Sequence, residues 1–135
     1  MLRSALSVWA GIALLTVTSF AIEAGVDPLL LRVFPDALPG REALLQNLWV
    51  RALTFTYGLM CVAAGGYVTV WIARRTPMTH AAALGIVQAG LTIAAMLSPL
   101  ANHASSLVWI CTAVLSFPAA LAGGAVYMKR KETSA

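Results

Sequence analysis

Charged residues are scarce in this chain of 135 residues. Asp, Glu, Lys and Arg together make up 10% of the sequence, and hydrophobic residues make up 60%. Water-soluble domains usually contain about one quarter charged residues. The few charges present lie at the ends of long apolar runs and not within them. This distribution excludes an ordinary soluble domain and predicts an integral membrane protein.

The groups from which catalytic and metal sites are built are also few. Cys61 and Cys111 lie in separate apolar runs, and His80 and His103 lie at opposite ends of another run. That run would hold the histidines about 30 Å apart, so they cannot both ligate one haem. No Ser/His/Asp set, phosphate-binding glycine loop or HExxH pattern is present. We therefore expect no enzyme activity, no cofactor and no metal; a metal site that joins His103 to acidic residues on its own side of the membrane is the alternative left open.

Nine basic residues exceed five acidic ones and give a net charge of +4. They form no basic helix face and no aromatic residues alternate with them, so the sequence predicts no nucleic-acid partner. If the chain crosses the membrane four times, six basic residues fall on one side and three on the other: Arg3, Arg74, Arg75, Lys129, Arg130 and Lys131 against Arg32, Arg41 and Arg51. By the positive-inside rule we expect a multi-pass protein of the bacterial cytoplasmic membrane with both termini in the cytoplasm.

Four runs without Asp, Glu, Lys or Arg are long enough to cross a hydrocarbon core of about 30 Å as helices. We place the spans at about residues 5–22, 52–73, 78–100 and 107–128, in a single domain over residues 1–135. The first run also has features of a secretory signal peptide, but it is longer than a typical apolar signal segment. The predicted fold class is all-α, a four-helix transmembrane bundle.

The segment of residues 23–51 is expected to be a long outer loop between the first two spans. It holds four of the five acidic residues, and prolines divide it into short pieces. After Pro28 we expect a short apolar turn on the bilayer surface, and after Gly40 a helix that continues into the second span. That helix would present an apolar outer contact surface formed by Leu44, Leu45, Leu48 and Trp49.

Small residues recur at helical spacing within the predicted spans. Thr54, Gly58, Cys61, Gly65 and Thr69 follow one another at intervals of four, three, four and four residues, which places them on one helix face. In lipid, helices associate through such faces because small side chains allow close backbone approach. The residues expected to mediate helix packing or partner contacts are Gly11, Gly58, Gly65, Gly66, Gly85, Gln88, Pro118, Gly123 and Gly124.

Two of these residues are not small. Gln88 is a strongly polar side chain deep in the third span, and we expect it to form an interhelical hydrogen bond. Pro118 has no N–H to donate to the carbonyl of Val114, so the fourth helix should bend there. Ser116 or Gln88 is the expected donor to the freed carbonyl.

A short pattern occurs twice in the chain. Ala64-Gly65-Gly66 and Ala122-Gly123-Gly124 each precede a basic cluster, and each lies in the second helix of a predicted hairpin. The repetition predicts two parallel hairpins, as in the repeat construction of some transporters. Chance repetition is the alternative in so apolar a chain.

Short motifs along most of the chain are those of one loose group of proteins: Arg3-Ser4, Ala10-Gly11, Gly65-Gly66-Tyr67, His80-Ala81, Pro118 and Gly123-Gly124. On these motifs the chain resembles small uncharacterised four-helix integral membrane proteins of bacteria. The resemblance implies the fold and the topology, and it implies no activity. The long segment of residues 23–51 is not part of that pattern.

These observations lead to two hypotheses of function. The first is a non-enzymatic membrane protein, either an accessory or assembly subunit or a self-associating bundle, whose partners are the lipid bilayer and other membrane subunits or a second copy. The absence of charge within the spans favours it, because ion-coupled transport generally requires an intramembrane charge. The alternative is a small-molecule or lipid transporter with a path between the two hairpins, near Gln88 and Pro118.

Overall fold

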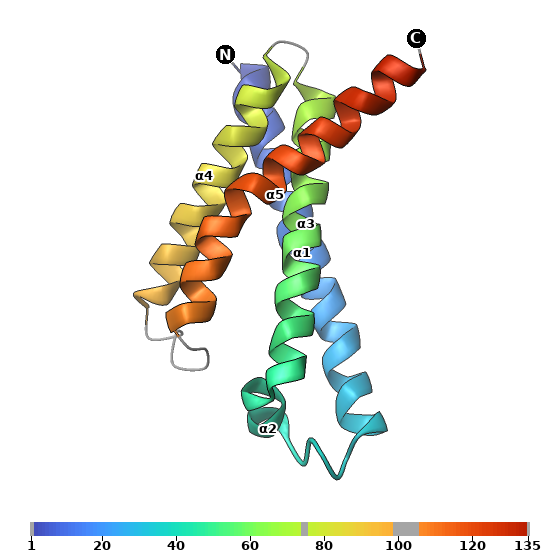
Figure 1. Ribbon diagram of the computed structural model, residues 1–135. Coiled ribbons are helices and arrows are strands. Elements are labelled where there is room, and N and C mark those ends of the chain that lie inside the picture. The colour runs from blue at the N-terminus through green and yellow to red at the C-terminus, as the bar shows by residue number, and fades with distance from the viewer. Residues whose placement is uncertain (1, 74–75, 99–105, 135) are drawn as a thin grey trace.

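The protein is built from α-helices. The computed structural model describes residues 2–73, 76–98 and 106–134, and over these residues it contains no β-strand (Figure 1). The helices in chain order are α1 (Leu2–Val33), α2 (Arg41–Gln46), α3 (Leu48–Ile72), α4 (Pro77–Met96) and α5 (Ser106–Thr133). The all-α fold class predicted from the sequence is confirmed.

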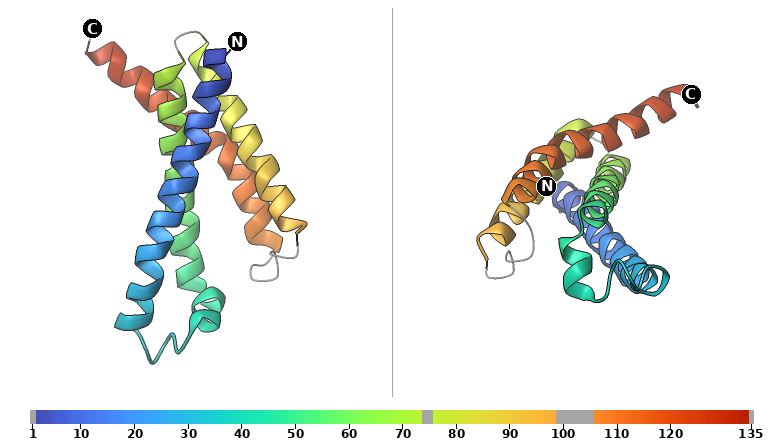
Figure 2. Two further views of the ribbon diagram at one scale, coloured as in Figure 1. Left: turned by 180° about the vertical axis from the view of Figure 1, so that it is seen from behind. Right: turned by 60° about the horizontal axis from the view of Figure 1, so that its bottom comes forward.

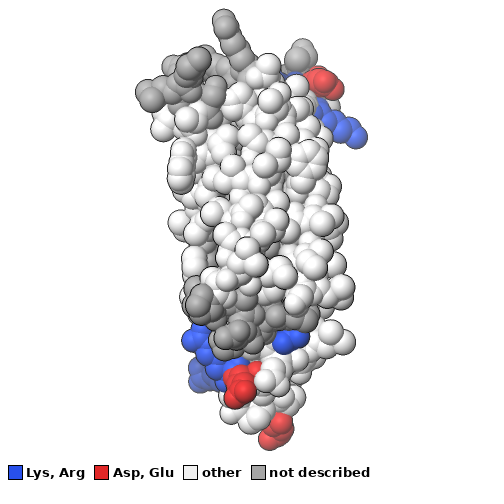
Figure 3. Space-filling view, turned by 90° about the vertical axis from the view of Figure 1, so that its left-hand side faces the viewer, with Lys and Arg blue, Asp and Glu red and all other residues white. Residues whose placement is uncertain are grey.

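Four of the helices, α1, α3, α4 and α5, are long and apolar enough to cross a membrane. Figure 3 shows where charge lies on one face of the molecule: charged side chains gather near the two ends, and a broad band between them is uncharged. Such a band is what the hydrocarbon core of a bilayer requires of the surface that contacts it. The chain is a multi-pass integral membrane protein, and the predicted four-helix transmembrane bundle is confirmed.

The four long helices form two hairpins that run in the same direction, α1 with α3 and α4 with α5 (Figure 1). The start of α1, the end of α3, the start of α4 and the end of α5 lie at one end, which we call the termini end. The short helix α2, the end of α4 and the start of α5 lie at the other, which we call the α2 end. The hairpins cross near the termini end and separate toward the α2 end, so the bundle is wedge-shaped (Figure 2).

Helices α3 and α5 cross through a reciprocal pair of glycine contacts. A Cβ atom built on Gly66 of α3 would lie 2.9 Å from the Cα of Ala120, and one built on Gly123 of α5 would lie 2.9 Å from the Cα of Ala63. Each helix therefore contributes the same Ala-x-x-Gly segment, with its glycine against the other helix's alanine. Real Cβ atoms essentially never approach so closely, so this crossing requires glycine at both positions.

The remaining helix contacts near the termini end also use glycine. A Cβ on Gly65 would lie 2.9 Å from the carbonyl oxygen of Gly11 in α1. In the second hairpin, a Cβ on Gly85 of α4 would lie 2.8 Å from the Cα of Phe117. A Cβ on Gly124 would lie 3.1 Å from the Cβ of Ala81. These contacts bring the backbones of α1, α3, α4 and α5 close together at the termini end.

Toward the α2 end, the glycines have no close neighbours. A Cβ on Gly58 of α3, Gly25 of α1 or Gly90 of α4 would meet nothing within 4 Å. The small-residue row predicted on α3 is therefore used over only part of its length. Its members toward the termini end, from Cys61 onward, are buried, whereas Thr54 is exposed.

Helix α1 is longer than expected. It continues beyond Ile22, past Pro28, and ends at Val33, so the prediction that residues 23–33 belong to a loop is wrong. A proline inside a helix removes one backbone hydrogen bond, which is why the sequence favoured a break there. Packing holds the helix together across it: a small apolar core of Leu38, Leu44 and Val50 packs against Leu30 and Leu31 of the extension.

The predicted continuous helix from Gly40 into the second span is also interrupted. Helix α2 ends at Gln46, and the side chain of Asn47 accepts a hydrogen bond of 3.1 Å from the backbone N–H of Trp49, which caps the start of α3.

The break between α2 and α3 divides the outer contact surface that was predicted to consist of Leu44, Leu45, Leu48 and Trp49. Leu44 is only 2% exposed and packs inside the chain with Leu45, so neither belongs to an outer contact surface. Leu48 is 82% exposed and Trp49 is 44% exposed, and Trp49 makes an edge-to-face contact with Phe34 at 5.8 Å between ring centroids. The predicted surface is therefore reduced to Leu48 and Trp49.

Helix α5 contains Pro118 and continues to Thr133, beyond the predicted end of the fourth span at about residue 128. The hydroxyl of Ser116 donates to the carbonyl of Thr112 at 2.7 Å and is not the donor to Val114 that we expected. His103, the possible metal ligand, and the basic residues Arg74 and Arg75 lie outside the described residues.

The crossing makes a prediction for stability. Gly66→Val and Gly123→Val should each lower the free energy of unfolding by about 2 kcal/mol or more, because the added side chain meets backbone that cannot move aside. Gly25→Ala is the matched control: it adds a methyl group into open space and should be neutral or stabilising by up to about 1 kcal/mol. Circular dichroism, recorded while each variant unfolds in detergent micelles, measures the free energies of unfolding. Equal stability of the two sets of variants would contradict the described crossing.

Candidate functional site

The most distinctive part of the molecule is a gap between two apolar cores. The larger core joins all four long helices and is centred on Leu15, Val62 and Leu84. The smaller core, at the α2 end, contains Leu44 and joins α1, α2 and α3. Between them, α1 and α3 face the diverging α5, and the space they enclose is the α2-end cleft.

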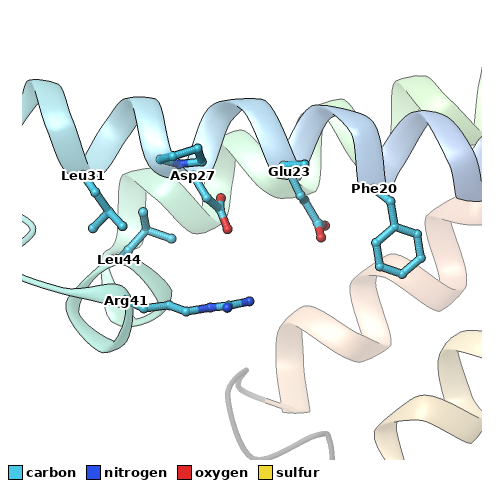
Figure 4. Close-up of a pocket in the computed structure, with 8 residues that line it drawn as sticks. Phe20, Glu23, Asp27, Leu31, Arg41 and Leu44 are labelled. Carbon is cyan, nitrogen blue, oxygen red and sulfur yellow. The ribbon is translucent and has the colours of Figure 1, made fainter.

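The cleft consists of two adjoining recesses with volumes of about 400 and 390 Å³. Both are lined by Glu23 and Asp27 of α1 and by Arg41 and Leu44 of α2. The first recess lies between α1 and α2 (Figure 4). The second extends across α3 to α5, where Val108, Trp109 and Thr112 form its far wall, with Gly58 of α3 beside them. These sizes are within the range of small-molecule and lipid-headgroup sites.

Charges of both signs line the cleft. Figure 4 shows Glu23 and Asp27 projecting from α1 into the recess, while Arg41 reaches toward the same space from α2. Tyr57 of α3 lines the second recess together with Glu23 and Arg41. Arg51, which lines the second recess, is positioned by a hydrogen bond of 2.7 Å from its Nε to the carbonyl of Leu45.

The position of Glu23 and Asp27 differs from the one expected from the sequence. Both acids lie within the continuous helix α1 and not in a loop after Ile22. Glu23 lines the second recess together with Tyr57 of α3, a residue of the span predicted over residues 52–73. The spacing of Glu23 and Asp27, one helical turn apart, was the signal in the sequence that they could share a helix face.

The wall formed by α5 supplies a further polar group. The indole N–H of Trp109 is buried and has no hydrogen-bond partner among the residues that the structure describes. A buried donor without an acceptor costs about 1–3 kcal/mol. The neighbouring Thr112 hydroxyl is already engaged, since it donates to the carbonyl of Val108 at 2.8 Å. Trp109 thus lines the recess with its ring, while its indole nitrogen is covered by the surrounding protein.

The residues that the sequence singled out fall into three groups. Gly58, Leu44 and Leu45 line the cleft. Neither recess is lined by Gln88 or Pro118, so the transport path predicted beside these two residues does not coincide with the cleft. The helix-contact glycines, at the crossings described above, are Gly11, Gly65, Gly66, Gly85, Gly123 and Gly124.

Gln88 does not have the role we predicted for it. It is half-buried in α4, where its backbone carbonyl accepts a hydrogen bond of 2.9 Å from the Thr92 hydroxyl. Within the described part of the chain, its side chain makes no hydrogen bond to another helix. The described residues also contain no group of three or more His, Cys, Asp or Glu side chains placed to hold a metal ion.

The wall of the cleft predicts a pattern of water access along α5. In a background where Cys61 and Cys111 are replaced by Ala, Thr112→Cys should react with a water-soluble maleimide, because Thr112 lines the cleft. Ser116→Cys, one turn along the helix, should be protected, because Ser116 is fully buried. Mass spectrometry of the protein in lipid nanodiscs measures both labelling rates. Equal rates would show that the cleft is closed at α5 or extends deeper than described.

Comparison of the chain with protein-family models, curated proteins and solved structures finds no match in any of the three. The fold and the site are therefore argued from the chain's own residues. What these establish is a multi-pass membrane protein with four apolar helices and a charged cleft at the α2 end.

Proposed function

We propose that this membrane protein is non-enzymatic and works by contact within the bilayer, as an accessory or assembly subunit of a larger complex or as a self-associating bundle. The observation that carries the proposal is an open glycine in the middle of α4. A Cβ on Gly90 would meet nothing within 4 Å, whereas Gly85 on the other face of the same helix packs against Phe117. Helix α4 thus has a small residue on each of two faces, and the chain itself covers only one.

An uncovered glycine is costly unless something approaches it. Glycine in a helix interior is about 1 kcal/mol less favourable than alanine. At Gly85 the cost is offset by close approach of α5, and at Gly90 nothing in the described chain offsets it. In lipid, small residues permit close packing of a second helix. Exposed Ile86, Ile93 and Leu97 lie along the same helix and would pack around such a contact.

The orientation of the protein is part of the proposal. The basic residues counted in the sequence support a bacterial cytoplasmic membrane in which the termini end faces the cytoplasm and the α2 end faces outward. The resemblance to small bacterial four-helix membrane proteins supports the same arrangement. The α4 face that carries Gly90 would then meet its partner within the hydrocarbon region.

The test is the size of the assembly that the protein forms. Extracted from native membranes in mild detergent, the wild-type chain should migrate with a partner subunit or as an oligomer, and Gly90→Leu should weaken that association by about tenfold or more, which corresponds to ~1.4 kcal/mol. Native mass spectrometry identifies the partner and separates a second copy of the chain from a different protein.

Two variants serve as controls. Gly25→Leu also adds a large side chain into open space, but on α1, and should leave the association unchanged. Gly85→Leu should disturb the fold itself, because Phe117 blocks the added side chain. A wild-type chain that is monomeric in native-membrane extracts, or a Gly90→Leu variant that associates like wild type, would refute the proposal.

A further inference from the structure

We propose that the α2-end cleft binds one aminophospholipid of the surrounding bilayer through its zwitterionic phosphoethanolamine headgroup. The inference does not depend on the α4 contact proposed above, because α4 lines neither recess of the cleft. It depends on the charges, the depth and the shape of the cleft.

The charges require an occupant that carries both signs. Glu23 and Asp27 face the recess from α1, and Arg41 faces it from α2 (Figure 4). Figure 4 shows the Arg41 side chain and the two carboxylates pointing into the same recess from different helices. A simple anion would be repelled by the two carboxylates, and a simple cation by the guanidinium groups of Arg41 and Arg51. A zwitterion whose ammonium and phosphate groups are joined by a short linker can place its ammonium against the carboxylates of α1 and its phosphate against Arg41 of α2.

The donor and acceptor chemistry matches phosphoethanolamine. A primary ammonium has three N–H donors for the oxygens of Glu23 and Asp27. A guanidinium forms paired, charge-assisted hydrogen bonds with phosphate oxygens, which suits Arg41.

The depth and shape of the cleft require a hydrophobic tail on the ligand. The second recess lies beside α3 within its predicted span and is lined by Phe55, Gly58 and Val108. Helices α1 and α5 diverge at the α2 end, as Figure 2 shows, and the second recess is lined from α1 across α3 to α5. An acyl chain can follow this apolar wall while the headgroup remains between α1 and α2. A soluble phosphoethanolamine would leave the wall uncovered.

These features predict an order of preference among lipids with identical acyl chains. Phosphatidylethanolamine should bind most tightly. Phosphatidylcholine has the same charges, but its quaternary ammonium has no N–H to donate to carboxylates. Phosphatidylglycerol lacks the cation and should be repelled by Glu23 and Asp27. The expected order is therefore ethanolamine, then choline, then glycerol.

Native mass spectrometry of the purified full chain, titrated with the dioleoyl form of each lipid, tests this order. Arg41→Gln should weaken phosphatidylethanolamine binding by about tenfold, since a charge-assisted pair with phosphate is lost. Arg32→Gln removes the same charge from an exposed position that lines neither recess, and it should bind like wild type. Equal binding of all three lipids by the wild type would overturn the proposal.

A double variant separates recognition from folding. Glu23→Gln with Asp27→Asn should abolish the preference for ethanolamine over choline and increase phosphatidylglycerol binding, because the cleft becomes net positive. A general loss of structure would lower binding of all three lipids and would not produce this reversal. Glu42→Gln, which removes an acid that does not line the cleft, is the matched control and should keep the wild-type order. An unchanged order in the double variant would overturn the assignment of the carboxylates.

Three further measurements test the place of binding, the source of the ligand and the independence of the two proposals. Gly58→Leu fills open space in the cleft and should reduce binding of all three lipids while leaving the α4-mediated assembly intact. Soluble phosphoethanolamine should compete only weakly with the lipid. If it binds as tightly as the lipid does, the occupant is not a bilayer lipid and the proposal fails. Gly90→Leu should not alter lipid binding, so this proposal and the proposed function fail by different results.

Discussion

The architecture depends on one backbone contact, the crossing of α3 and α5 at Gly66 and Gly123. Two helices that meet through glycine come close at that point and separate on either side of it. In water, the hydrophobic effect would draw the separated halves together. In a bilayer, lipid tails cover apolar helix surfaces as well as protein does, so that force is absent. The wedge at the α2 end is therefore a stable consequence of the crossing and needs no ligand to hold it open.

The spans and most helix-contact glycines could be predicted from the sequence. The spans follow from uncharged runs of sufficient length, and the helix contacts follow from small residues at helical spacing. The repeated pattern was also visible, but one residue out of register. The sequence aligned Gly65-Gly66 with Gly123-Gly124, whereas the structure matches the segment from Ala63 to Gly66 with the segment from Ala120 to Gly123. Only the contact itself distinguishes these registers.

The cleft was not predictable from the sequence, and the reason is specific. The uncharged run ends at Ile22, and Pro28 is an ordinary signal for a helix end, so the sequence assigned Glu23 and Asp27 to the outer loop. Their actual position in α1 depends on the packing of Leu30 and Leu31 against Leu38 and Leu44, residues whose contacts no local pattern reveals. Once α1 extends, the two acids lie opposite α3 and Arg41. There they line the cleft together with Arg41 and do not project from a loop.

The two proposed sites are joined by a single helix. Near its start, α5 lines the cleft through Val108, Trp109 and Thr112, and about two turns later Phe117 packs against Gly85 of α4. A lipid bound between α1 and α5 would fix the separation of the two hairpins. Because α4 contacts α5 closely, the position of the α4 face that carries Gly90 would be fixed as well. Lipid binding in the cleft and partner binding on α4 would then be coupled through the placement of α5, and this coupling requires contacts that differ between the lipid-bound and lipid-free forms.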